Sequence, residues 1–87
     1  MSGKEVLEQL LAINRSCREA LAQNDFQKLQ AILDIKKDLM KLLKSSQFSK
    51  DDISEIEQVL RDEEELARLV LLKKRSLVEF MNVSNFN

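Results

Sequence analysis

The sequence predicts an all-α protein, an antiparallel up-down-up bundle of three helices with a long third helix. Three observations favour this class. The chain of 87 residues has one Gly and no Pro, so little in it interrupts a helix. Hydrophobic residues (44%) and charged residues (33%) occur in proportions typical of a folded helical domain rather than a disordered chain. Three helix-start signals divide the chain, and each precedes a stretch of helical periodicity.

Each start signal has the form of a capping box, in which one side chain accepts a hydrogen bond from the backbone amide three residues later. Short connections between the segments make neighbouring helices antiparallel. The signals predict one domain, residues 1–87, with helices at about 3–22, 25–45 and 50–82, and a tail, residues 83–87, that we expect to be flexible. The capping pairs are Ser2 with Glu5, Asn24 with Gln27, and Ser49 with Asp52.

Apolar residues form seams on the three predicted helices. The first helix has one seam, the second has two adjacent seams and should touch two neighbours, and the third has one main seam. Glu63 falls on the third seam, and we expect it to be partly buried beside Lys36 or Arg15. The seams are Val6, Leu10, Ile13, Cys17 and Ala20; Phe26, Leu29, Leu33, Met40 and Leu43; Ile32, Ile35, Leu39 and Leu42; and Ile53, Ile56, Leu60, Ala67, Val70, Leu77 and Met81.

The third helix is predicted to outrun its neighbours. At 1.5 Å per residue it would be roughly 50 Å long, against roughly 30 Å for each of the others. Beyond about Leu71 or Leu72 it would project past the bundle with large apolar side chains and a short basic cluster. We predict that these residues bind a protein partner through apolar contact with a basic rim. The candidate site residues are Leu71, Leu72, Lys73, Lys74, Arg75, Val78, Phe80 and Met81.

Three arrangements of this end of the chain are open from the sequence. The helix could end early or bend back onto the bundle. Two copies could pair through their projecting ends as a homodimer. A helix of a different protein could lie on the apolar surface, since Met and Phe side chains suit adaptable helix-in-groove contacts.

The residues for common enzyme chemistry are missing. The chain has no His, and its one Gly cannot form a phosphate-binding loop, so we expect no enzyme, no cofactor and no metal site. We predict that Cys17, on the first seam, is a buried core residue. The acidic run Asp62–Glu65 is interpreted as a solvated helix face, because di-metal bundles need Glu-x-x-His pairs.

Charge and hydropathy limit the partners and the location. A net charge of −1 argues against general binding to nucleic acid, and Lys73–Arg75 lacks the interleaved aromatic residues of nucleic-acid modules. No apolar run approaches 18 residues and no signal peptide is evident, so we expect no membrane insertion. A single Cys fits a reducing compartment, and we expect the protein to be cytoplasmic.

Two long stretches resemble the FliT-like flagellar export chaperones of type III secretion. They are "LLAINRSCREALAQNDFQKLQAILDIKKDLMKLL" (residues 10–43) and "ISEIEQVLRDEEELARLVLLKKRSLVEF" (residues 53–80). The resemblance implies a cytoplasmic chaperone that binds an apolar helix of a flagellar secretion substrate, the filament-capping protein, and keeps it unassembled until export. The alternative is a structural helical protein that forms a homodimer or small assembly through the end of the third helix.

Overall fold

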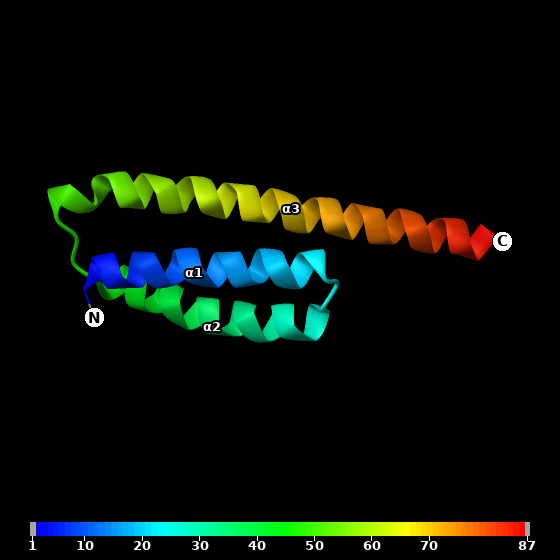
Figure 1. The fold of residues 1–87 in the computed structure, drawn as a ribbon, viewed down its shortest axis with the longest axis horizontal. Coiled ribbons are helices and arrows are strands. Elements are labelled where there is room, and N and C mark those ends of the chain that lie inside the picture. The colour runs from blue at the N-terminus through cyan, green and yellow to red at the C-terminus, as the bar shows by residue number, and fades with distance from the viewer. Residues whose placement is uncertain (1, 87) are drawn as a thin grey trace.

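The fold is an all-α bundle of three helices in up-down-up order, as predicted (Figure 1). The structure is a computed structural model that describes the backbone of residues 2–86 and the side chains of residues 2–82. Helix α1 spans Gly3–Ala22, α2 spans Phe26–Ser45, and α3 spans Ile53–Phe86 after a short 3-10 turn, η1, at Lys50–Asp52. These bounds agree closely with the sequence prediction, except at the end of α3.

Local hydrogen bonds set the starts of α1 and α2. The Ser2 side chain accepts from the Glu5 amide at 3.2 Å, as predicted. The cap of α2 is Asp25, which accepts from the Lys28 amide at 3.1 Å, and not the predicted Asn24. Asn24 instead adopts a positive φ of 56°, a conformation that Asn tolerates and that ends α1. Asn24 therefore forms the turn after α1, and the next residue, Asp25, caps α2.

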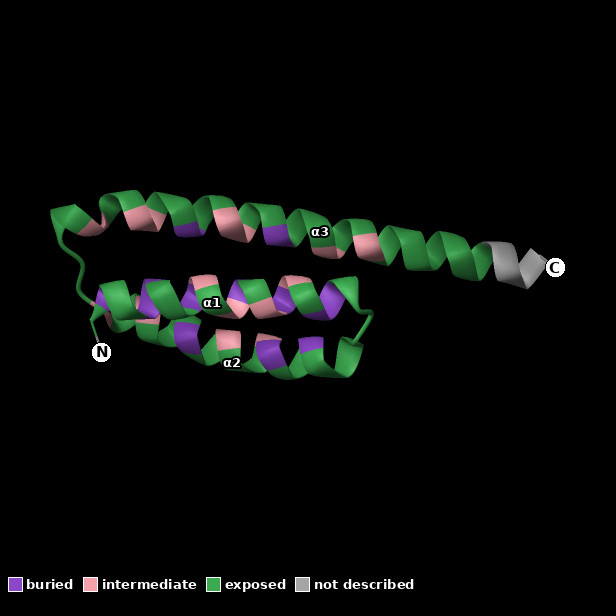
Figure 2. Cartoon of the chain, viewed as in Figure 1, coloured by how far each residue is buried: buried purple, intermediate pink, exposed green. Residues whose placement is uncertain are grey.

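The helix in the middle of the bundle is α1. It packs against both α2 and α3, whereas α2 and α3 approach each other at almost no backbone position. Buried residues accordingly concentrate on α1 (Figure 2). The prediction that the second helix touches two neighbours holds only in part: α1 takes the central position, and α2 meets α3 through side-chain contacts such as that of Lys36 with Glu63. The second seam of α2 is only half used: Ile32 and Leu39 are buried, but Ile35 is 54% and Leu42 45% exposed.

The face of α3 that packs on α1 is rotated from the predicted seam. Val59 and Leu66 are buried, whereas Leu60 is 58% exposed and Ala67 is also exposed. One residue along a helix corresponds to a rotation of about 100°. Two members of the predicted seam, Ile56 and Val70, do pack against the core, whereas Leu60 lies on the side of α3 that turns towards Leu43 of α2 and stays largely uncovered.

Helix α3 extends well beyond the other two (Figure 1). Leu69 and Lys73 lie level with the last turn of α1, because they line one hollow together with Leu21 and Ala22. The rest of the helix, residues 74–86, projects by about 20 Å at 1.5 Å per residue. The helix neither ends early nor bends back, which excludes the first of the three arrangements. The predicted tail of residues 83–87 is helical up to Phe86, and Asn87 lies outside the described residues.

Gly3 is buried where the connection from α2 to α3 crosses the start of α1. A Cβ atom on Gly3 would lie 2.5 Å from the Phe48 ring and 2.6 Å from the Gln47 carbonyl oxygen. We expect Gly3→Ala to lower the free energy of unfolding by about 1–3 kcal/mol, since the connection must move. Urea denaturation measures this, with the exposed neighbour Lys4→Ala as a control that should change little. Equal stability of the two variants would contradict this crossing.

Candidate functional site

The end of α3, from Leu71 onwards, carries large apolar side chains that the rest of the described chain leaves about half or more exposed. Leu71 and Leu72 are 47% and 50% exposed, and Val78, Phe80 and Met81 are between 55% and 69% exposed. Monomeric proteins rarely expose so many large apolar side chains on one short segment without a binding role. All five belong to the candidate site predicted from the sequence.

The helix geometry divides the predicted site into two faces. Residues three, four and seven apart share a face. The first face contains Leu71, Lys74, Arg75 and Val78, and it continues the exposed stripe of Leu60 and Ala67. The second contains Leu69, Leu72, Lys73 and Phe80. The eight predicted residues therefore do not form one surface, and Met81 lies at the edge of the first face.

The basic residues of the site differ in their surroundings. Lys73 is half-buried and lines a hollow of about 300 Å³ with Arg18, Leu21, Ala22 and Leu69, where the end of α1 meets α3. Lys74 and Arg75 are exposed beyond this hollow. Among the described side chains none of the three basic residues forms an ion pair. Their charges remain available to an acidic group on a partner.

A polar network crosses the middle of the bundle and includes the fully buried Asn14. The Asn14 amide Nδ2 donates to Asp62 Oδ2 at 2.9 Å and to Glu63 Oε1 at 2.8 Å. Glu63 Oε2 accepts from Lys36 Nζ at 2.5 Å, and Asp62 pairs with Arg18. The predicted pairing of Glu63 with Lys36 is confirmed, and Arg15 stays exposed. This network links all three helices and fixes their register.

The network lowers the pKa of one carboxyl group. Burial alone would raise the pKa of Asp62, but hydrogen bonds from Arg18 and Asn14 outweigh burial, so this pKa lies below its ordinary value. The prediction of a solvated acidic face is therefore wrong for Asp62, whereas Glu63 was expected to be partly buried. Asp62 and Glu63 are partly buried in the network, whereas Glu64 and Glu65 are exposed. Within the described chain no group of acidic, Cys or His side chains could hold a metal ion.

Cys17 lies in the hydrophobic core of the bundle. The residue is fully buried beside Ala20 and Leu66. Burial is the main cause that raises the pKa of its thiol; the positive charges of Lys36 and Arg18 lower this pKa to a smaller extent, and the negative charge of Glu63 raises it. A buried thiol with a raised pKa is a poor nucleophile. The prediction that Cys17 is a core residue is confirmed.

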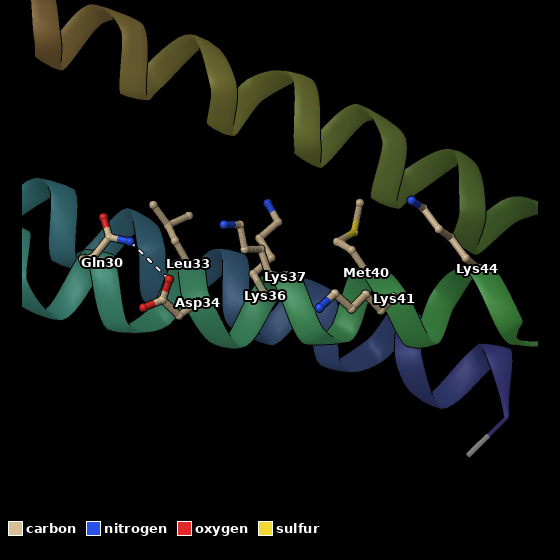
Figure 3. Close-up of a pocket in the computed structure, with 8 residues that line it drawn as sticks. All are labelled: Gln30, Leu33, Asp34, Lys36, Lys37, Met40, Lys41 and Lys44. Atoms are coloured by element: carbon tan, nitrogen blue, oxygen red, sulfur yellow. Dashed lines mark hydrogen bonds between the residues drawn. The ribbon is translucent and has the colours of Figure 1, made fainter.

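A wide hollow lies along α2, on the side that turns towards α3 (Figure 3). Its volume is about 730 Å³. Figure 3 shows Lys37, Lys44 and Met40 pointing to the side where α3 runs. The sequence pattern did not single out this surface. A signal was available, because Lys37, Lys41 and Lys44 recur at helical spacing, but such spacing also occurs on solvated faces. The lining residues are Gln30, Leu33, Asp34, Lys36, Lys37, Met40, Lys41 and Lys44.

Comparison of the chain with known protein families, with curated proteins and with solved structures finds no match. The described residues contain no helix with the length and apolar character needed to cross a membrane.

Proposed function

We propose that the protein binds an apolar helix of another protein and acts as an export chaperone. One observation carries the helix-binding part: α3 projects past the bundle with Leu71, Val78 and Phe80 about half or more exposed. The class of client, a flagellar secretion substrate such as the filament-capping protein, follows from the resemblance of residues 10–43 and 53–80 to FliT-like chaperones. Cytoplasmic capture of such a client before export is part of the same proposal.

The chemistry of the projecting helix suits reversible capture. A client helix that covers one face would bury several large apolar side chains, each Å² of apolar surface contributing about 25 cal/mol. Loss of translational and rotational freedom offsets much of this gain, so binding in the micromolar range is expected. Lys74 and Arg75 border the first face and would attract acidic residues on the client helix. Moderate affinity would allow the client to leave at the export apparatus.

The two faces of the projecting helix permit a matched test. The probe is a fluorescently labelled synthetic peptide of the C-terminal helix of the filament-capping protein, titrated with the chain and followed by anisotropy. The variants are Leu71→Asp with Val78→Asp on the first face, and Leu72→Asp with Phe80→Asp on the second. Both add the same charge to exposed positions. We expect one pair to weaken binding at least about tenfold, since Asp in an apolar contact loses its hydration.

The difference between the two pairs identifies the face that binds the client. Circular dichroism should show that both double variants keep the helical content and stability of the bundle, because all four positions are exposed. Unchanged binding of the peptide in both double variants would refute the assignment of the site to this end of α3. No binding of the peptide to the wild-type chain would refute the proposed client.

A further inference from the structure

The side of the bundle where α2 and α3 do not pack closely carries an unpartnered surface of its own. On α2 it consists of Leu33 and Met40 with Lys37 and Lys41, which line the 730 Å³ hollow. On α3 it consists of the exposed stripe that includes Leu60 and Ala67. Leu60 is 58% exposed and Met40 37% exposed, so apolar contact area is available on both helices.

The charged residues that border the apolar stripe differ between the two halves of this surface. Lys37, Lys41 and Lys44 border the α2 half, and none of them forms an ion pair among the described side chains. Glu57 and Glu64 share the outer side of α3 with Leu60, because they lie three before and four after it. Both glutamates are exposed, and in the described chain neither is paired. The three unpaired lysines of the α2 half, which outnumber its one acidic lining residue, Asp34, are thus complementary to Glu57 and Glu64 of the α3 half.

We propose that this surface is occupied by a second copy of the chain, with each α2 packed against α3 of the other copy. A two-fold axis parallel to the helices produces this arrangement and makes the same patch serve both chains. Since α2 and α3 are antiparallel within one chain, the axis keeps them antiparallel between chains. The four helices α2 and α3 of both copies then form an antiparallel four-helix bundle, the usual geometry for packed helices.

The intrachain register supports the fit of the two copies. The contact of Lys36 with Glu63 at 2.5 Å shows which levels of α2 and α3 coincide. A two-fold axis parallel to the helices preserves these levels between copies. Residue numbers on α2 and α3 that add to about 99, the sum of 36 and 63, then lie opposite each other.

This register pairs residues of matching chemistry. Met40 of one copy lies level with Leu60 of the second copy, and Lys37 and Lys41 lie level with Glu64 and Glu57 of the second copy. The apolar residues Met40 and Leu60 therefore meet, and these two lysines face glutamates. The apolar pairs would supply affinity, and the charge pairs would fix orientation and register.

The projecting end of α3 is a poorer occupant of the same surface. It carries Lys73, Lys74 and Arg75, whereas the α2 half already carries unpaired lysines. Like charges at such short range oppose contact. The acidic part of α3 in a second copy has the required sign. The proposal is therefore independent of whether the end of α3 captures a client.

A charge-reversal experiment tests the dimer. Wild-type chain should show twice the 10.1 kDa chain mass by light scattering at high micromolar concentration. Lys37→Glu with Lys41→Glu, and separately Glu57→Lys with Glu64→Lys, should each weaken the dimer at least about tenfold, because like charges then face each other. An equimolar mixture of the two variants should restore the dimer mass as a mixed pair. Salt should weaken the wild-type dimer.

Two further variants serve as controls. Lys4→Glu with Lys28→Glu makes the same change of charge at exposed positions away from the surface and should leave the dimer intact. Leu72→Asp with Phe80→Asp should also leave it intact. A monomeric wild-type chain overturns the proposal and leaves the surface to a helix of another protein. A dimer lost only in the Leu72 and Phe80 variant, or a variant mixture that stays monomeric, overturns it as well.

Discussion

Replacing Leu10 by Ala is expected to lower the free energy of unfolding by about 2–5 kcal/mol, the range for Leu→Ala substitutions in a close-packed core. Leu10 is fully buried on α1 and packs with Leu39 of α2 and Val59 of α3. It is therefore a contact point of all three helices. Native domains are stable by only about 5–15 kcal/mol, so this one change should remove a large part of the stability of a small bundle.

Urea denaturation at one fixed chain concentration measures the effect of Leu10→Ala. The matched control is Ile35→Ala, which removes a side chain of similar size from a position that is 54% exposed. We expect the control to change the free energy of unfolding by less than about 1 kcal/mol. If Ile35→Ala is as destabilising as Leu10→Ala, the outer face of α2 is covered and the central position of α1 is wrong.

Replacing Asp62 by Asn is expected to destabilise the protein at neutral pH by about 1–3 kcal/mol, the cost of leaving buried polar groups without a partner. The Asp62 side chain is 16% exposed and holds both Arg18 and the buried Asn14. Asn at position 62 has no charge for Arg18 and presents a second NH₂ group to Asn14. The control is Glu65→Gln, because the Glu65 side chain is 62% exposed and lies 3.7 Å from Arg18.

The same variant should change the response of stability to acid. The pKa of Asp62 is lower in the folded chain than in the unfolded chain. The unfolded state therefore binds the proton first, and the contribution of Asp62 is complete above its unfolded pKa, about 3.9. It is lost as pH falls through the folded pKa. Unfolding measured from about pH 5 to pH 2 should be less steeply pH-dependent in Asp62→Asn than in the wild-type chain. An identical slope would contradict the lowered pKa.

The helices were predictable because their signals are local. Ser2 accepts from the Glu5 amide in the structure, as the capping box at the start of α1 predicts, and the bounds of α1 and α2 follow within a residue. Which side of each helix contacts which neighbour was less predictable. Seams on α2 and α3 indicate apolar contact but not which neighbour provides it. Exposure of Ile35 and Leu60 depends on the position of α1 between the other two, which no local pattern encodes.

The projection that carries the candidate site was predictable from the sequence, whereas the hollow along α2 was not. Helix lengths alone placed the projection beyond about Leu71, because rise per residue is constant. The division of Leu71 and Leu72 between two faces also follows from helix geometry, once the helix is known to continue straight. The α2 hollow with Lys37 and Lys41 could not be predicted in this way. Whether a row of lysines on a helix faces open solvent or lines a hollow depends on how far away the neighbouring helix lies.

The projection of α3 has a consequence for how the helix melts. A segment the length of residues 74–86 is too short to be a stable helix by itself in water, since nucleation of an isolated helix is unfavourable. The packed turns of α3 up to Lys73 supply that nucleus, and the rest propagates from them. Amide hydrogen exchange should therefore show a gradient of protection that declines from Lys73 towards the C-terminus, while Val59 and Leu66 exchange only on global unfolding. A partner that binds the projection would also order its last helical turns, so binding and completion of the helix would be one event.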